Sequence, residues 1–169
     1  IILYEQKEVE KALEFYKKGI TIDPDFAEIY NNLGLLYANN NLGADKAESY
    51  YKKSLSLNSK NPETHNNLGS LYWHGKGVSK DRHKAESLFA LAVEENSSLA
   101  QVNLGLIHTE RGDNDSPNLH ALSLFLTSYA KGSPEVKSLI NSVLMKAPVK
   151  NIVRATRNTK RFLSQKSRN

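Results

Sequence analysis

The sequence predicts an all-α fold, a solenoid of antiparallel helix pairs. Two observations predict it: one eight-residue segment occurs three times, and a series of alanines is interleaved with it at the same period. A third observation argues against a membrane protein, because no apolar run approaches the length of about 18 residues that a membrane-spanning helix needs. The class of fold therefore follows from internal repetition in a chain of 169 residues.

The repeated segment marks the first helix of each pair. Its copies are Tyr30–Tyr37, His65–Tyr72 and Gln101–His108. Each copy contains the triplet Asn-Leu-Gly, and the glycines follow one another at steps of 35 and 36 residues: Gly34, Gly69 and Gly105. A glycine at a fixed place on a helix allows another backbone or side chain to approach closely. We therefore expect one close helix crossing at each of these glycines.

The alanine series marks the second helix of each pair. The alanines are separated by 35, 38 and 36 residues: Ala12, Ala47, Ala85 and Ala121. An aromatic residue stands four positions after each: Tyr16, Tyr51, Phe89 and Phe125. A small residue stands seven positions after each: Gly19, Ser54, Ala92 and Ser128. Positions i, i+4 and i+7 share one helix face, so the series predicts a second packed helix in each repeat.

Turn residues between the periodic segments set the expected boundaries. We expect a truncated first helix over residues 1–6, then helices over 10–22, 26–40, 44–58, 62–74, 82–95, 98–110 and 117–131. A capping helix over 134–146, with Ser133 as N-cap and Pro134 at its first position, would cover the apolar face of the last repeat. Pro148 separates it from a basic helix that begins near Val149 and ends between Leu163 and Gln165. The predicted organisation is a repeat array over 1–132 with a truncated first repeat, a cap over 133–147 and a basic tail over 148–169.

The two series together resemble the tetratricopeptide repeat, whose signature is W-x2-L-G-x2-Y, then A-x3-F, then P. Pro24 and Pro62 stand where that proline ends one repeat and opens the next. The third repeat resembles the related Sel-one-like repeat, because Gly75-Lys76-Gly77-Val78-Ser79-Lys80-Asp81 reproduces its longer G-x-G-V-x-x-D loop. The two glycines of that loop supply the positive φ angles that its length requires.

The resemblance covers Ile1 to Gly132 and implies a right-handed α-solenoid. The fourth repeat departs from the pattern, because Arg111 to Pro117 replace the glycine loop and His108 replaces the tyrosine. We expect the fold to continue through that repeat.

No constellation of residues supports catalysis or a cofactor. The chain has no cysteine, and none of its histidines (His65, His74, His83, His108 and His120) stands four residues from another, as a helical metal site requires. Gly75-Lys76-Gly77 lacks the spacing of a phosphate-binding loop and a preceding strand. The sequence predicts a non-enzymatic protein without metal or cofactor.

The resemblance implies a binding groove lined by the first helix of each repeat. The residue two before each signature glycine would point inward: Asn32, Asn67 and Asn103. A ladder of amides can donate to and accept from the backbone of an extended peptide, and it resembles the asparagine ladder of the O-linked N-acetylglucosamine transferases. The alternative is that asparagine is simply common at this position in such repeats and has no role in binding. The groove candidates are Asn31, Asn32, Leu35, Asn39, Asn66, Asn67, Ser70, Trp73, His74, Asn103, Leu106 and Glu110.

Two further features bear on the kind of ligand that the groove would bind. Trp73 either packs against the longer loop that follows it or forms an anchor pocket for a partner side chain. Chaperone adaptors of the family clamp a C-terminal carboxylate with lysine and arginine, whereas this chain has neutral or acidic residues there: Asn31, Asn66, Glu28, Glu63 and Leu99. This difference argues against a chaperone tail as the ligand.

The charge of the chain is concentrated in its tail. Residues 1–145 carry 15 basic and 18 acidic residues, and residues 146–169 carry eight basic residues and no acidic one. Five of the tail cations are candidates for contact with RNA or an acidic partner: Lys150, Arg154, Arg157, Lys160 and Arg161. Val149, Ile152, Val153 and Thr156 form a second, apolar face, so the helix could instead pack as a solvated cap or lie on an anionic membrane.

We expect a protein-binding scaffold or a fixed subunit of a larger assembly, whose partner is an extended peptide or a neighbouring subunit. The alternative is a structural subunit of a ribonucleoprotein, for instance an organellar ribosome, in which the tail contacts RNA. An enzyme with its catalytic domain outside this segment is a third class. The absence of cysteine favours an intracellular location, cytosolic or mitochondrial, and a start at Ile1 rather than methionine suggests that natural residues precede it.

Overall fold

The computed structural model describes residues 2–40, 42–110, 116–132, 136–144 and 149–166. Within these ranges the chain forms nine α-helices and no strand, so the predicted all-α class is confirmed. The chain divides into two compact units, Ile1–Glu95 and Asn96–Asn169. None of the helices in the described ranges is both long and apolar enough to cross a membrane.

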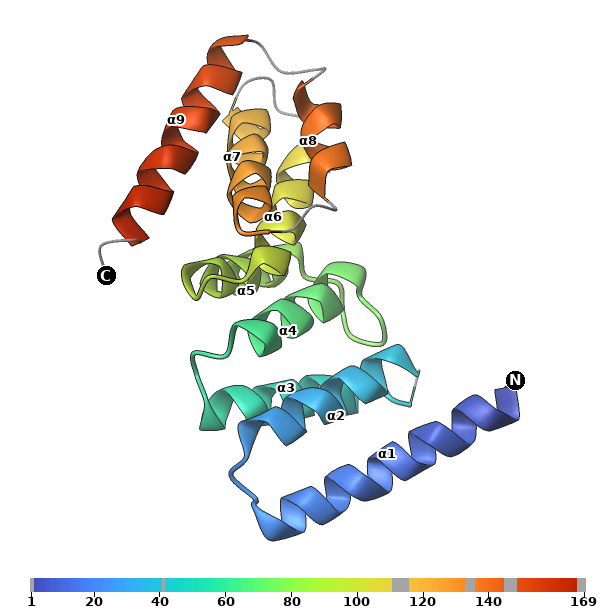
Figure 1. Ribbon diagram of the computed structural model, residues 1–169. Coiled ribbons are helices and arrows are strands. Elements are labelled where there is room, and N and C mark those ends of the chain that lie inside the picture. The colour runs from blue at the N-terminus through green and yellow to red at the C-terminus, as the bar shows by residue number, and fades with distance from the viewer. Residues whose placement is uncertain (1, 41, 111–115, 133–135, 145–148, 167–169) are drawn as a thin grey trace. The chain divides into compact units, whose positions relative to one another are not determined.

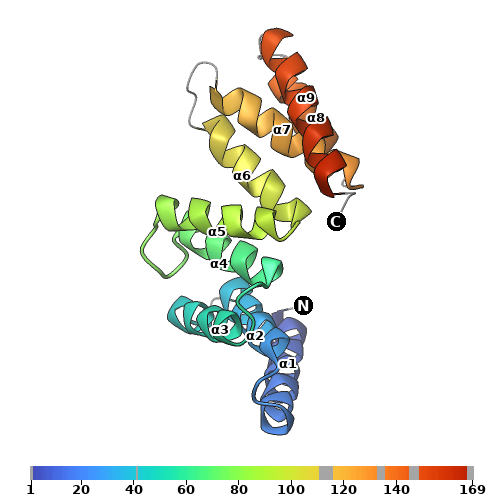
Figure 2. The ribbon, with the colours of Figure 1, turned by 90° about the vertical axis from the view of Figure 1, so that its left-hand side faces the viewer.

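The first unit contains two antiparallel helix pairs and one further helix (Figures 1 and 2). Its helices are α1 Ile2–Ile22, α2 Ala27–Asn39, α3 Ala44–Leu57, α4 Pro62–His74 and α5 Arg82–Glu94. Helix α2 packs on α3 and α4 packs on α5, as the two sequence series predict. Helix α2 also contacts α1 and α4, so the first helices of successive repeats are neighbours.

Helix α1 differs from the expected two helices over 1–6 and 10–22, because it is continuous from Ile2 to Ile22. The residues between Gln6 and Glu10 include no glycine or proline that would end a helix. Ion pairs one turn apart support it, since Lys11 Nζ lies 2.9 Å from Glu8 Oε1 and Lys18 Nζ lies 2.8 Å from Glu14 Oε1. The expected break was therefore wrong.

The glycines and aromatic residues of the two series meet in space. A Cβ atom at Gly34 would lie 2.6 Å from the ring of Tyr51, and one at Gly69 would lie 3.0 Å from Phe89 Cε1. In the second unit, a Cβ atom at Gly105 would also collide with the ring of Phe125. The alanines one turn before these rings are fully buried: Ala47, Ala85 and Ala121. The predicted crossings and their register are thereby confirmed.

The second unit is built around α7. Its helices are α6 Ser98–Glu110, α7 Ser116–Ala130, α8 Lys137–Leu144 and α9 Val149–Lys166. Helix α7 packs on α6, and α8 and α9 both pack on α7 from different sides (Figure 1). The buried core of this unit comprises Ala121, Leu122, Phe125, Val136, Ile140, Val143 and Ala155. The predicted N-cap Ser133, Pro134 and Pro148 lie outside the described residues.

Helix α9 packs through only part of the apolar face expected, because Ile152 packs against the core of the second unit but Val153 and Thr156 do not. Val153 is 53% exposed and Thr156 is also exposed, whereas Ala155 and Thr159 are buried. Thr159 Oγ1 donates to the carbonyl of Ala155 at 3.0 Å and lies 3.4 Å from the carbonyl oxygen of Ser123 on α7. The small side chains of Ala155 and Thr159 allow α9 to approach α7 closely. The place of a residue around the helix therefore decides whether it is buried, and the more apolar Val153 stays exposed.

Candidate peptide-binding site

A pocket opens on the first unit between α2 and α4. Its volume is about 90 Å³, well below the several hundred Å³ of a typical small-molecule site. Nine residues line it: Leu35, Ala38, Asn39, Tyr51, Asn67, Ser70, Leu71, His74 and Lys76. Their spacing of three or four residues along α2 and α4 places each helix's contribution on one face. The pocket therefore suits part of a side chain or a stretch of backbone.

Five of the predicted groove residues meet in this pocket: Leu35, Asn39, Asn67, Ser70 and His74. The prediction omitted Ala38, which stands three positions after Leu35 on the same helix face, and Lys76, which enters from the loop after α4. Helical spacing could have identified Ala38. The contribution of Lys76 depends on the path of the loop, which spacing does not define.

Part of the pocket wall is held by buried core residues. Tyr51 and Leu71 are almost fully buried. Burial raises the pKa of the Tyr51 hydroxyl further above its ordinary value, which already leaves a tyrosine neutral at physiological pH. Leu35, at 39% exposed, is accessible to a ligand from the opposite wall. An apolar group could thus rest against the uncharged side chains of Leu35, Tyr51 and Leu71.

The asparagines of the expected ladder fall into two groups. Asn31 and Asn66 are 4% and 3% exposed, so neither offers its side chain to a groove, in contrast to the expectation. Asn67 Nδ2 donates to Asn31 Oδ1 at 3.1 Å, which links α4 to α2. An amide can donate two hydrogen bonds and accept through its oxygen, so Asn67 retains capacity for a ligand after this bond.

The remaining ladder positions lie on different units. Asn32 is half-buried on α2, and Asn103 is half-buried on α6 in the second unit. Leu106 and Glu110, also on α6, are exposed. Among the predicted groove amides of the first unit, Asn39 and Asn67 line the described pocket and Asn32 does not.

The loop after α4 has the conformation that its glycines predict. Gly75 and Gly77 have φ angles of 64° and 73°, the left-handed region that favours glycine. The backbone N–H of Asp81 donates to the carbonyl of Tyr72 at 3.1 Å, which ties the end of the loop to α4. The Asp81 carboxylate then caps α5 by accepting from the N–H of Lys84 at 2.9 Å.

Trp73 contacts this loop, in agreement with the packing interpretation. Lys80 Nζ lies 5.8 Å and Arg82 Cζ lies 5.1 Å from the centroid of its ring, within the range of cation–π interactions. The side chain is half-buried and is not among the residues that line the pocket.

A neighbouring carboxylate is already occupied. The Tyr72 hydroxyl donates to Glu48 Oε1 at 2.6 Å, and Lys52 Nζ lies 2.5 Å from the same oxygen. These two hydrogen bonds, that of Lys52 first, hold the pKa of Glu48 below its ordinary range. Burial and the Glu48 carboxylate raise the pKa of Tyr72 to about 12. This cluster fastens α3 to α4 rather than serving as a ligand site.

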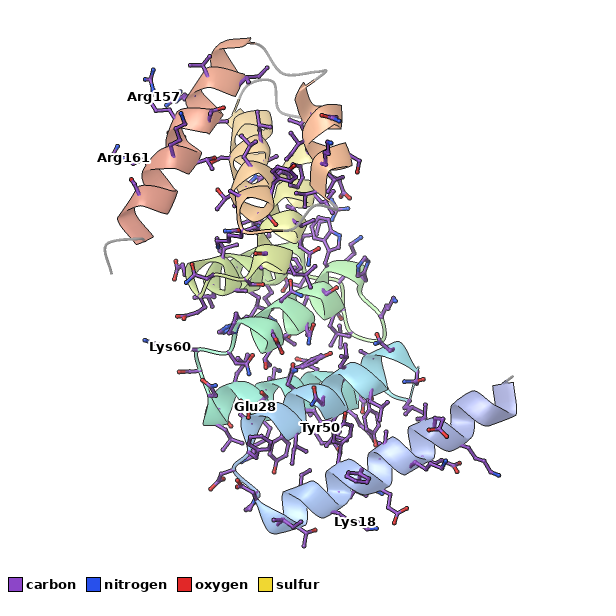
Figure 3. All side chains as sticks on the ribbon, in the orientation of Figure 1. Lys18, Glu28, Tyr50, Lys60, Arg157 and Arg161 are labelled. Atoms are coloured by element: carbon purple, nitrogen blue, oxygen red, sulfur yellow. The ribbon has the colours of Figure 1, made fainter. Side chains whose placement is uncertain are left out.

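The tail cations are exposed on α9 in the second unit. Arg154, Arg157, Lys160 and Arg161 are all exposed, and none forms an ion pair with another described residue. Figure 3 shows Arg157 and Arg161 projecting from α9 on the side away from α7. The side chain of Lys150 lies outside the described part of the chain. These four cations form a charged face that can meet an anionic partner.

In the described part of the chain, no group of three histidine, aspartate or glutamate side chains comes together as a metal site. His65 is buried, and its Nδ1 atom has no hydrogen-bond partner among the residues that the structure describes. Burial lowers the pKa of His65, so the imidazole is neutral at physiological pH.

Family models match three segments of the chain, of which the first two overlap. They are a TPR repeat over residues 2–41, a tetratricopeptide repeat over 27–61 and a Sel1 repeat over 62–97. The chain belongs to the tetratricopeptide and Sel1 repeat family. Repeats of this family generally form non-enzymatic scaffolds for protein–protein interaction.

Solved structures show the same fold. A protective antigen of uropathogenic Escherichia coli strains, described as displaying an SLR fold, is 25% identical, with a TM-score of 0.78 over 92% of this chain and 33% of that chain. A Sel1 repeat protein from Oxalobacter formigenes is 21% identical, with a TM-score of 0.63 over 78% of this chain and 59% of that chain. MamA is 20% identical, with a TM-score of 0.56 over 95% and 94% of the two chains.

This chain thus spans about a third of the length of the Escherichia coli antigen. The likeness to the Oxalobacter formigenes protein and to MamA is a likeness of fold. No curated protein sequence matches the chain.

Proposed function

We propose that the first unit binds an extended segment of a partner protein across the pocket between α2 and α4. The observation that carries this proposal is the convergence of five predicted groove residues on one open pocket. Helices α2 and α4 are the first helices of their repeats, and the Asn31–Asn67 hydrogen bond fixes them next to each other.

The lining suits backbone recognition. Asn39, Asn67 and Ser70 offer amide and hydroxyl groups that can both donate and accept hydrogen bonds. An extended peptide presents alternating N–H and C=O groups to such a wall. A volume of about 90 Å³ then accommodates a small apolar group beside Leu35 and Leu71. Affinity would come from hydrogen bonds to the peptide backbone, and selectivity would come from the size of the side chain that the small pocket admits.

The test selects ligands from a displayed library of random peptides and measures their dissociation constants by fluorescence anisotropy. Ser70→Phe places a ring in the pocket, and Ser56→Phe makes the same change on the exposed face of α3. We expect Ser70→Phe to weaken binding about tenfold or more, because the ring competes with the ligand for the pocket, while Ser56→Phe binds like the original chain. Equal binding by both variants would place the ligand elsewhere.

The second candidate function is contact with RNA through α9. It is favoured by the four exposed cations of α9, which have no carboxylate partner in the described ranges. Phosphates would replace that missing partner, and binding would then weaken steeply with salt. The arrangement would suit a structural subunit of a ribonucleoprotein, with protein held by the repeats and RNA by the tail.

A further inference from the structure

One rim of the pocket is basic. His74 and Lys76 line it, and Lys80 and Arg82 follow on the loop and at the start of α5; all four side chains are exposed. Among the described residues, no ion pair involves Lys76, Lys80 or Arg82, which we call the basic loop. We propose that the segment bound in the groove is acidic and that its carboxylates lie against the basic loop, an inference that rests on the proposed function.

The positive charge of this region is not neutralised locally. Residues 74–84 contain four lysines and arginines, two histidines and one acidic residue, Asp81. The Asp81 carboxylate is occupied, because it accepts from the N–H of Lys84 at 2.9 Å and lies 3.7 Å from Lys84 Nζ. Lys76, Lys80 and Arg82 therefore remain available to an external anion.

The basic loop contrasts with the rest of its unit. Outside residues 74–84, residues 1–95 carry 13 acidic and 8 basic residues, a net charge of −5. A local positive site on a negative surface attracts a short anionic segment and orients it as it approaches. A long polyanion that follows the surface would instead meet the acidic remainder of the unit.

The structure holds the cations in place before a ligand arrives. The contacts of Lys80 and Arg82 with the Trp73 ring restrict two long side chains, which lowers the entropy lost when they bind a carboxylate. A Cβ atom at Gly75 would lie 2.8 Å from Lys80 Cβ, so the loop is also packed closely against itself. The basic loop is thus a defined surface next to the pocket.

A protein carboxylate fits this site better than a nucleic acid. The Trp73 ring already contacts two cations, which would compete with a base for stacking on it. The amides and hydroxyl of the adjacent pocket match the backbone of an extended peptide. Carboxylates spaced along such a backbone would reach the basic loop while the backbone crosses the pocket.

The test uses three fluorescein-labelled probes at low salt: a peptide of alternating glutamate and alanine, its glutamine counterpart, and a short oligouridylate. We expect the glutamate peptide to bind the full chain about tenfold more tightly than the glutamine peptide, because three exposed ion pairs each add a modest gain. The double variant K80E/R82E should abolish that difference. The control K17E/K60E changes the net charge equally at exposed sites away from the loop and should preserve it.

Trp73 provides a second readout, because it is the single tryptophan of the chain and contacts the basic loop. Its emission should change and saturate as the glutamate peptide is added. Equal affinity for the two peptides, or undiminished preference in K80E/R82E, would overturn the inference, as would an oligouridylate that binds more tightly than the glutamate peptide and loses affinity in K80E/R82E. If Ser70→Phe loses binding but the original chain shows no preference for glutamate, the result would support peptide binding in the groove and overturn the inference that the peptide is acidic.

Discussion

A Cβ atom at Gly34 would lie 2.6 Å from Cδ1 and Cε1 of Tyr51, so α2 and α3 cross at a distance that a side chain on Gly34 would prevent. Tyr51 is buried and cannot swing into solvent. The same relationship joins Gly69 to Phe89 in the next repeat. The crossings set how far α2 and α4 stand from their partner helices, and so they position the two walls of the pocket.

Gly34→Ala tests this crossing, because the sign of its effect on the free energy of unfolding depends on whether the Tyr51 ring lies against Gly34. In an exposed helix, replacing glycine by alanine stabilises by up to about 1 kcal/mol. Here the added methyl group meets the Tyr51 ring, and overpacking should destabilise by roughly 1–3 kcal/mol. Urea denaturation followed by circular dichroism would measure the change, and a more stable variant would contradict the assigned register.

Ala85→Leu tests the alanine series. Ala85 is fully buried, and its carbonyl oxygen lies 3.3 Å from the Cβ position of Gly69. The three additional carbon atoms of leucine cannot fit there, so we expect destabilisation of roughly 1–3 kcal/mol or more. Ala130→Leu, at an exposed position near the end of α7, is the matched control and should leave the thermal midpoint nearly unchanged. Similar midpoints for both variants would argue against a packed crossing at Ala85.

The Glu48 carboxylate predicts a specific dependence of stability on pH. The hydrogen bonds from Lys52 and Tyr72 lower its folded-state pKa, so its contribution is fully present above the unfolded pKa of about 4.3 and is lost as pH falls through the folded pKa. Glu48→Gln should therefore destabilise the chain by on the order of 1 kcal/mol at about pH 7 and by less at about pH 3. Urea denaturation at both pH values checks this, and a difference that does not change with pH would exclude the proposed cause.

The tail is best tested by neutralising charge, because Ile152 and Ala155 of α9 contribute to the core of the second unit and truncation would expose that core. On a single strand each phosphate contact adds about 0.7 to the slope of log affinity against log salt, so four cations predict a slope magnitude of about 3. The double variant R157Q/R161Q should lower it by about 1.4, measured by anisotropy of a labelled oligouridylate. An unchanged slope, or no salt-sensitive binding by the original chain, would remove the support for RNA contact.

The fold was predictable because packing at small residues leaves a strict period in the sequence. Gly34, Gly69 and Ala85 each occupy a place that larger side chains cannot fill. The loop after α4 was predictable for a related reason, since positive φ at Gly75 and Gly77 favours glycine. The continuity of α1 could have been inferred from the missing glycine or proline between residues 6 and 10.

The candidate site was predictable only in part. Asn66 and Asn67 are adjacent in sequence, and a rotation of about 100° per residue separates a buried side chain from one that lines the pocket. Which of them faces the groove depends on how successive helix pairs stack, and the sequence period does not specify that. The face of α9 that packs on α7 depends on tertiary contact in the same way.

The most direct measurement of the central claim is the location of a bound peptide by nuclear magnetic resonance. A library-selected peptide would be titrated into the isotopically labelled chain while the backbone and asparagine side-chain amide signals are followed. The proposed function predicts that the largest shifts occur at Asn39, Asn67, Ser70 and Lys76, because these residues line the pocket. Shifts confined to the exposed faces of α3 and α5, or to α9, would contradict it.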